Sequence, residues 1–67
     1  MNIRVNDQPR DVALGATLLD LLRELALAEC KGVAVAINDT VVPRTTWPKH
    51  PLRESDSVLV IQATQGG

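Results

Sequence analysis

The residues best placed to do chemistry stand at the C-terminal end of the sequence. Two of the four glycines are its last residues, Gly66 and Gly67. At an average glycine usage of about 7%, two terminal glycines arise by chance in about 0.5% of chains, so the pair merits a functional hypothesis. Without Cβ atoms, the pair is the thinnest possible polypeptide and leaves the Gly67 carboxylate unhindered. A carboxyl group that is threaded into another protein and attacked there needs these properties.

The rest of the chain offers little for catalysis. His50, the only histidine, stands between Lys49 and Pro51 and is expected to be a solvated surface residue. Cys30, the only cysteine, is predicted near the C-terminal end of a helix, where the dipole disfavours a thiolate. The aspartates lie in or beside predicted turns, without the spacing of a metal-binding loop. We therefore expect no catalytic residue and no metal site in the body of the domain.

Composition excludes several classes of partner. The 67 residues carry seven basic and eight acidic side chains, and Trp47 is the only aromatic residue. A nucleic-acid-binding protein normally has a basic excess or aromatic stacking platforms, so nucleic acid is not expected as a partner. The longest apolar runs are far too short to span a bilayer, so no membrane is expected either. With one cysteine, no internal disulfide forms, and a small domain without disulfides is typical of the cytoplasm.

Hydropathy patterns predict the elements that must position the glycine pair. Residues 1–5 alternate between apolar and polar as a strand does, residues 6–9 have turn chemistry, and Val12 and Leu14 alternate in a second strand. These segments predict an N-terminal hairpin, which Gly15 ends.

A helix is predicted next. Thr17 is a candidate N-cap and Asp20 stands in the capping-box position. Lys31 and Gly32 are the expected helix end, because a cation and a left-handed glycine suit that position. Four leucines at helical spacing form one apolar stripe: Leu18, Leu21, Leu22 and Leu25.

The second half of the chain predicts three further strands. Residues 33–37 form a continuous apolar run, a turn follows at 38–39, and residues 40–42 suit a short strand. Residues 44–53 are predicted as a loop with one short helical turn near Trp47. Residues 58–61 form a last strand that is apolar on both faces, which is typical of a central strand or of one with a face kept for a partner.

This order predicts an α+β protein of two layers, a β-grasp. Its mixed sheet of four to five strands carries one helix on one face, and the last strand lies beside the first. Residues 1–63 are the expected domain and residues 64–67 a flexible tail ending in Gly-Gly. Four extended residues reach about 13–14 Å, which is enough to enter a cleft of another protein.

The whole chain resembles the ThiS family, the small ubiquitin-like sulfur carriers of thiamin biosynthesis. The stretches that carry the resemblance are Asn6-Asp7, the run from Val35 to Arg44 with Trp47 after it, and the ending Gln65-Gly66-Gly67. Glu54-Ser55-Asp56 departs from the family pattern of an acidic residue, glycine and aspartate.

The resemblance implies a defined chemistry. A ubiquitin-activating-like adenylating enzyme (ThiF type) would use ATP and magnesium to convert the Gly67 carboxylate to an acyl adenylate. Sulfur that a cysteine desulfurase supplies would displace AMP and leave a thiocarboxylate on Gly67, which thiazole synthase (ThiG type) would consume. The chain would bind no cofactor stably and would act as a protein co-substrate, with Gly66 providing access.

Partner binding is expected on the sheet face opposite the helix. By analogy with ubiquitin-like proteins, Val58 and Val60 face the core, which leaves Leu59 and Ile61 as an exposed apolar patch. The alternative is that both faces of this strand are covered. Arg44 and Trp47 are candidates for the border of the patch, although a turn arginine and a packed tryptophan fit the sequence equally well.

Three other functions are compatible with the same residues. The small subunit of molybdopterin synthase shares the fold, the Gly-Gly end and the thiocarboxylate, but the Val-Pro-Arg and Trp47 stretch favours the thiamin family. A ubiquitin-like protein modifier would use Gly67 to join target lysines. In a plain interaction module the Gly-Gly end would be incidental.

Overall fold

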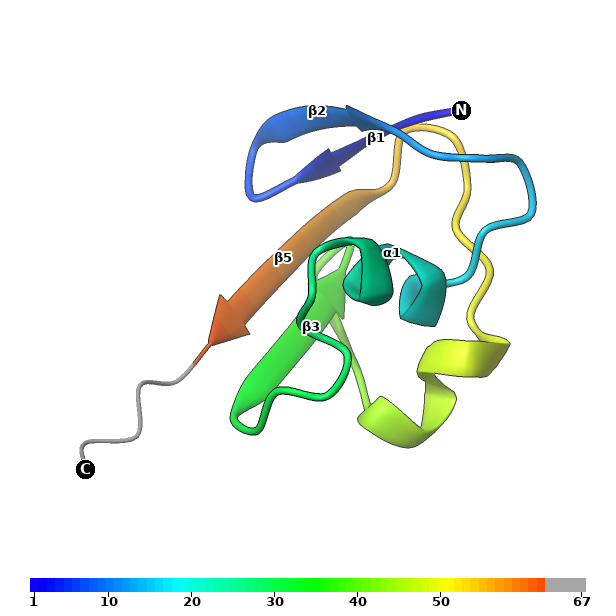
Figure 1. Ribbon diagram of the computed structural model, residues 1–67. Coiled ribbons are helices and arrows are strands. Elements are labelled where there is room, and N and C mark those ends of the chain that lie inside the picture. Colours follow the sequence, from blue (N-terminus) through cyan, green and yellow to red (C-terminus); the bar gives the residue numbers. More distant parts are fainter. Residues whose placement is uncertain (63–67) are drawn as a thin grey trace.

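The fold is built on a five-stranded mixed sheet with the strand order β2-β1-β5-β3-β4 (Figure 1). The computed structural model describes residues 1–62. The strands are β1 (Asn2–Val5), β2 (Gln8–Asp11), β3 (Val33–Ile37), β4 (Thr40–Val42) and β5 (Ser57–Gln62). β1 and β5 run parallel at the centre, and the other three pairs are antiparallel. The predicted mixed sheet is therefore confirmed, whereas the boundary between domain 1–63 and tail 64–67 lies outside the described residues.

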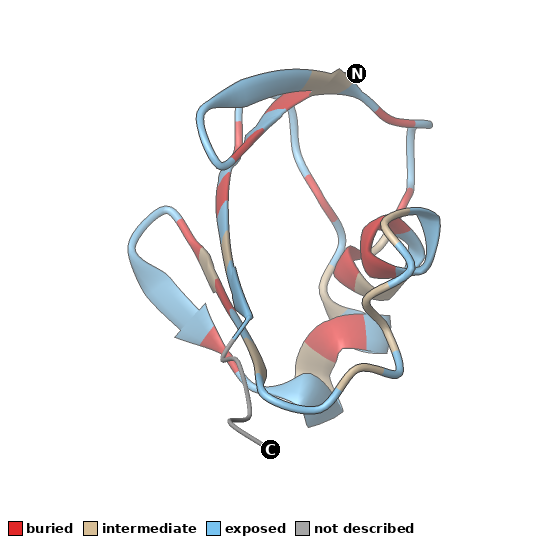
Figure 2. Ribbon diagram, turned by 60° about the vertical axis from the view of Figure 1, so that its left-hand side comes forward, coloured by how far each residue is buried: buried red, intermediate tan, exposed pale blue. Residues whose placement is uncertain are grey.

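Two helices cover one face of the sheet: α1 (Leu18–Glu24) and the 3₁₀ helix η1 (Arg44–Lys49) (Figure 1). Figure 2 shows the buried residues gathered on the sides where helices and sheet meet. The core consists mainly of aliphatic side chains. They come from every strand except β2, from α1, from η1 and from the connecting segments: Ile3, Val5, Val12, Ala16, Leu18, Leu21, Leu22, Val35, Ile37, Val42, Trp47, Leu52 and Val58. Both the two-layer arrangement and the burial of the leucine stripe agree with the sequence prediction, except that Leu25 is only half-buried.

The start of α1 is a capping box, as the sequence predicts. The Asp20 backbone N–H donates to Thr17 Oγ1 at 3.2 Å, and the Thr17 backbone N–H donates to Asp20 Oδ2 at 3.0 Å. The hydrogen bond to the Thr17 backbone is the main cause of a lowered pKa of the Asp20 carboxyl, and the hydrogen bond with the Thr17 side chain lowers this pKa further. Two backbone donors that the first turn would leave unpaired are satisfied in this way.

The end of α1 differs from the prediction, because the helix stops at Glu24 and not near Lys31. Ala26 adopts a left-handed backbone with φ of 61°. Its N–H donates to the Arg23 carbonyl and the Leu27 N–H donates to the Leu22 carbonyl, which is the Schellman pattern of a helix end. The positions three and four residues beyond Leu25, which would continue the apolar stripe, hold Ala28 and Glu29. A longer helix would therefore bury little apolar surface.

The second strand also lies elsewhere than predicted. β2 is Gln8–Asp11, Val12 is buried just beyond it, and Leu14 is 84% exposed in the loop that follows. The register explains the difference, since the two-residue turn places Gln8 directly opposite Val5. A tight turn fixes register more strongly than the alternation of two apolar residues does.

Both hairpin turns consist of Asn followed by Asp. The φ angles are 51° and 66° at Asn6 and Asp7, and 50° and 70° at Asn38 and Asp39. Two successive positive φ angles define a type I′ turn, whose twist matches that of the paired strands, and Asn and Asp tolerate this backbone. The turns connect β1 to β2 and β3 to β4.

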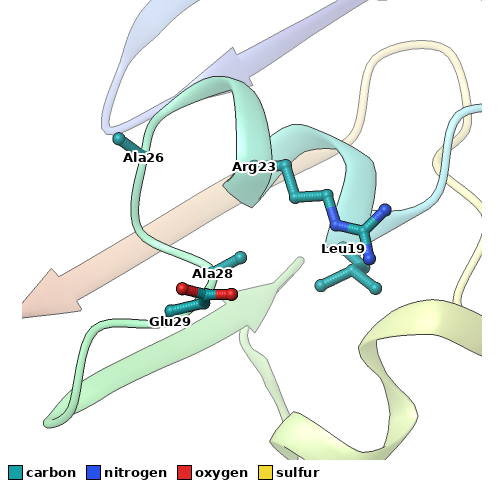
Figure 3. A pocket seen from close by; sticks show the side chains of 5 residues that line it. All are labelled: Leu19, Arg23, Ala26, Ala28 and Glu29. Atoms are coloured by element: carbon teal, nitrogen blue, oxygen red, sulfur yellow. The ribbon is translucent and has the colours of Figure 1, made fainter.

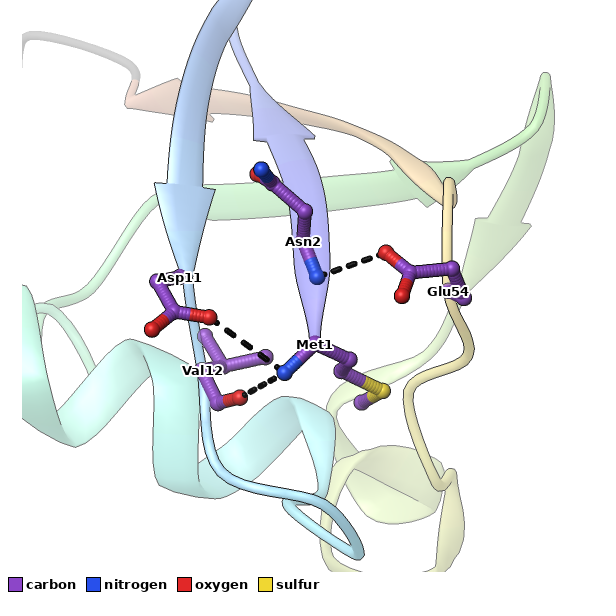
Figure 4. Close-up of polar contacts among 5 residues, drawn as sticks. All are labelled: Met1, Asn2, Asp11, Val12 and Glu54. Atoms are coloured by element: carbon purple, nitrogen blue, oxygen red, sulfur yellow. Dashed lines mark hydrogen bonds and ion pairs between the residues drawn. The ribbon is translucent and has the colours of Figure 1, made fainter.

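Polar contacts fasten β1 to its neighbours at the edge of the molecule where the chain begins (Figure 4). The Met1 ammonium donates to the Val12 carbonyl at 2.7 Å and lies 3.3 Å from an Asp11 carboxylate oxygen. The Asn2 backbone N–H donates to Glu54 Oε2 at 2.6 Å. Because Glu54 belongs to the segment that enters β5, these contacts help to set where the central strand starts.

Candidate functional site

β5 is the element that leads to the glycine pair. It is the middle strand of the sheet, with β1 on one side and β3 on the other, and Gln62 is the last residue that the structure describes. Gly66 and Gly67, the predicted sulfur-carrying end, lie outside the described residues. The candidate site within the described part of the chain is therefore the surface around the end of β5.

The two faces of β5 divide as predicted. Val58 is 1% exposed and Val60 is half-buried, whereas Leu59 is 49% and Ile61 is 54% exposed. Alternating side chains of a strand point to opposite faces, and the helices cover only one of them. The alternative that both faces are covered is excluded by these exposures.

Neighbouring strands extend the exposed side chains into an apolar patch. Ala36 of β3 lies opposite Leu59, and Val41 of β4 lies opposite Ala36, while Ala34 lies opposite Ile61. Residues directly opposite in a sheet share a face. We call Ala34, Ala36, Val41, Leu59 and Ile61 the open-face patch. Val41 is 72% exposed and was missed by the sequence analysis, because its place depends on the order of the strands.

Trp47 lies in the core and does not border the open-face patch. It is 1% exposed, and its indole N–H donates to the Val42 carbonyl at 3.0 Å. Of the two alternatives for this residue, the packed tryptophan agrees with the structure. As the buried residue of η1, it lies on the helix-covered side of the sheet, opposite the patch.

Arg44 fastens η1 to the segment after α1. Its guanidinium donates to the carbonyls of Ala28 and Cys30, at 2.6 and 2.5 Å, and lies 4.6 Å from the centre of the Trp47 ring. A cation over an indole face is attracted by the ring quadrupole. Arg44 thus has three structural contacts on the helix side, and the structure does not bring it together with Leu59 and Ile61.

The described residues contain no evident catalytic arrangement. Within residues 1–62, no three His, Cys, Asp or Glu side chains come together in a way that could hold a metal ion. The Cys30 thiol contacts the Ala26 carbonyl at 3.5 Å, in a loop six residues beyond the end of α1, so the helix-dipole argument for this thiol does not apply. A pocket beside α1 offers no nucleophile next to a base (Figure 3); it is lined by Leu19, Arg23, Ala26, Ala28 and Glu29.

Neither helix in the described part of the chain has the length and apolar character that crossing a membrane requires. The sheet, with its parallel central pair and a helix across one face, defines a β-grasp protein with an α+β fold.

Comparison with known proteins places the chain within this class. The model of the ThiS family matches residues 3–67. The sulfur carrier protein ThiS of Escherichia coli is 39% identical over 67 residues, which cover both chains completely. A thiazole synthase of Magnetococcus marinus is also 39% identical over 67 residues, which make up 20% of that protein. The crystal structure of ThiS from Geobacter metallireducens superposes with a TM-score of 0.83 at 29% identity, over the whole of both chains. The chain belongs to the ThiS family.

Proposed function

We infer that this protein is a sulfur carrier of thiamin biosynthesis. The observation that carries the inference is the full-length match to a sulfur carrier protein ThiS, which includes the segment ending in Gly66 and Gly67. The likeness in fold to a ThiS crystal structure supports it independently of short motifs. The name of the related thiazole synthase gives the sulfur a destination, the thiazole moiety of thiamin.

For the chemistry, we propose that Gly67 carries the sulfur. A carboxylate is a poor electrophile, so it must first be activated. The Gly67 carboxylate attacks the α-phosphorus of ATP on an adenylating enzyme that uses magnesium, and pyrophosphate leaves. The terminal sulfur of a persulfide from a cysteine desulfurase route then attacks the acyl carbon of the adenylate, AMP leaves, and an acyl disulfide forms. A second thiol attacks the sulfur of this S–S bond that lies farther from the acyl group, so that a new disulfide leaves and a thiocarboxylate remains on Gly67. Because Gly66 has no side chain, the end of the chain is thin enough to enter each active site.

Two partner enzymes follow from this proposal: the adenylating enzyme (ThiF type) and thiazole synthase (ThiG type). The open-face patch is the proposed surface for docking them, because it gathers three of the four large exposed apolar side chains found in residues 1–62: Val41, Leu59 and Ile61. In this scheme the protein is a co-substrate and has no turnover of its own. ATP use and the single cysteine favour a cytoplasmic location.

Mass spectrometry of the intact protein tests the proposal. The protein is incubated with the adenylating enzyme, ATP, magnesium and a sulfur source, and its C-terminal fragments are then analysed. Replacement of one oxygen by sulfur on Gly67 is expected. Fragmentation is needed because oxidation of Met1 or Cys30 adds nearly the same mass.

Two variants complete this test. Deletion of Gly67, or addition of one residue after it, is expected to abolish thiocarboxylate formation. Sulfur transfer that persists in either variant would refute the role of Gly67. An isopeptide bond from Gly67 to a target lysine would indicate a protein modifier, and sulfur delivered only to a molybdopterin precursor would indicate the other sulfur-carrier class.

A further inference from the structure

The last part of β5 has a strand neighbour on one side only. β3 pairs with β5 from Val58 to Gln62, whereas β1 pairs with it only at Ser57 and Val58. β1 ends at Val5 because the chain turns away at Asn6 and Asp7. Figure 1 shows β5 continuing past the β1–β2 hairpin toward the C-terminal end. The part of β5 that leads to the tail would thus be held from the β3 side alone, unless another group replaced β1.

The Asn6 side chain supplies this replacement. In the parallel pair, the Arg4 N–H donates to the Asp56 carbonyl and the Asn6 N–H donates to the Val58 carbonyl, both at 2.9 Å. A regular ladder would continue with the Val60 N–H donating to the main-chain carbonyl of Asn6. The Val60 N–H donates to Asn6 Oδ1 at 2.8 Å. The side-chain carbonyl therefore takes the place of a main-chain carbonyl that the turn has moved away.

Asn38 makes the same kind of contact at the opposite end of β5. The Asn38 N–H donates to the Ser57 carbonyl at 2.8 Å, and the Ser57 N–H donates to Asn38 Oδ1 at 3.0 Å. The two asparagines open the two type I′ turns and hold the two ends of one strand. Only Asn6 acts on the end next to the tail, so Asn38 is a natural control for it.

We propose that Asn6 is a positioning residue for the reactions of Gly67. By accepting the hydrogen bond of the Val60 N–H, its side chain keeps β5 bonded on both sides as far as Val60. A partner that binds the end of β5 then meets a strand that is already held in place, which favours its binding. The inference rests on the proposed sulfur-carrier function, and it concerns a residue far from Gly67 in the sequence.

The test compares three variants in the adenylation assay and by amide hydrogen exchange. Asn6→Gly keeps a residue that accepts φ of 51° but removes the acceptor oxygen. Asn6→Asp keeps an acceptor for the Val60 N–H, and Asn38→Gly removes the matched contact at the start of β5. Asn6→Gly is expected to speed exchange of the Val60 amide and to lower kcat/KM by about 2- to 12-fold, through KM, which is the range of one net hydrogen bond.

The control variants separate positioning from general stability. Asn6→Asp is expected to keep kcat/KM within about twofold of the wild-type value. Asn38→Gly is expected to lower the melting temperature, because Asn38 Nδ2 also donates to the buried Asp56, yet to leave kcat/KM unchanged at temperatures where the protein is folded. If the wild type is adenylated but Asn6→Gly has an unchanged kcat/KM, this inference alone is overturned. The same holds if Asn38→Gly lowers kcat/KM as much as Asn6→Gly does. A wild type that is never adenylated would overturn the proposed function as well.

Discussion

At the residue scale, six residues other than glycine have a positive φ within residues 1–62, and Ala26 stands apart because it alone has no polar side chain. Four are the Asn and Asp residues of the two hairpin turns, whose side chains tolerate a left-handed backbone, and a fifth is Ser55, in the turn that leads into β5. Ala26 has no such side chain, and its Cβ meets the carbonyl oxygen in this conformation. The Schellman end of α1 holds Ala26 there, through the bonds of Ala26 and Leu27 to the helix carbonyls. The domain accepts a local strain to end the helix early.

Ala26→Gly is therefore expected to stabilise the protein. Glycine removes the Cβ conflict at φ of 61°, and this gain exceeds the greater freedom of glycine in the unfolded chain. We expect about 1 kcal/mol, or about 4–8 °C in melting temperature for a domain of this size. Thermal and urea unfolding measure both quantities. Ala28→Gly, at a position without a positive φ, is the control and is expected to be neutral or destabilising; stabilisation by both variants to the same extent would contradict this explanation.

At the scale of the elements, the sequence predicts what depends on local pattern and misses most of what depends on neighbouring elements, although the pairing of the last strand with the first was predicted correctly. The capping box and the leucine stripe predict the start of α1, because both act within one turn or two. The prediction of where α1 ends was wrong, because no glycine or proline marks the true end and the left-handed residue there is Ala26. The exposure of Leu59 and Ile61 was predicted correctly because alternation places the two on one face of the strand, and the likeness to ubiquitin-like proteins assigned that face to the outside. The place of Val41, the contact of Asn6 with β5 and the helix-side position of Arg44 all require the strand order and register, which no local pattern contains.

The capping box of α1 gives a pH dependence that can be measured. Hydrogen bonds from Thr17 lower the pKa of Asp20 in the folded state. A lowered folded pKa means that the contribution to stability is present above the unfolded pKa and is lost as the pH falls through the folded pKa. At pH 7, Asp20→Asn is thus expected to have a lower free energy of unfolding than the wild type. This difference is expected to shrink in urea titrations below about pH 4, where the carboxyl takes up its proton. An equal difference from pH 7 down to pH 2.5 would exclude the charged cap as its cause.

At the scale of the whole molecule, the surface combines protected sheet edges with one unprotected apolar face. The edge strand β2 contains Pro9, which has no N–H to offer, and the other edge strand, β4, has only three residues. Both features discourage pairing with a further strand. The open-face patch has no such protection. A net charge of −1 also gives little electrostatic repulsion between copies of the protein. An apolar face retained on so small a domain is best explained by a partner that covers it.

Charged substitutions in the open-face patch test this explanation directly. Leu59→Lys and Ile61→Lys each place a charge where a docked partner would exclude water, at side chains that are 49% and 54% exposed in the free protein. Each variant is expected to lose less than about 1 kcal/mol of stability but to lower kcat/KM with the adenylating enzyme by about 5- to 30-fold, as loss of an interface anchor does. Leu14→Lys is the matched control, because Leu14 is 84% exposed but lies in the loop between β2 and α1. If Leu14→Lys and Ile61→Lys reduce kcat/KM equally, the effect is one of charge on the whole protein and the patch is not the docking surface. If only Leu59→Lys and Ile61→Lys lower kcat/KM, the partner docks on the open-face patch, which includes side chains of the strand that leads to Gly67.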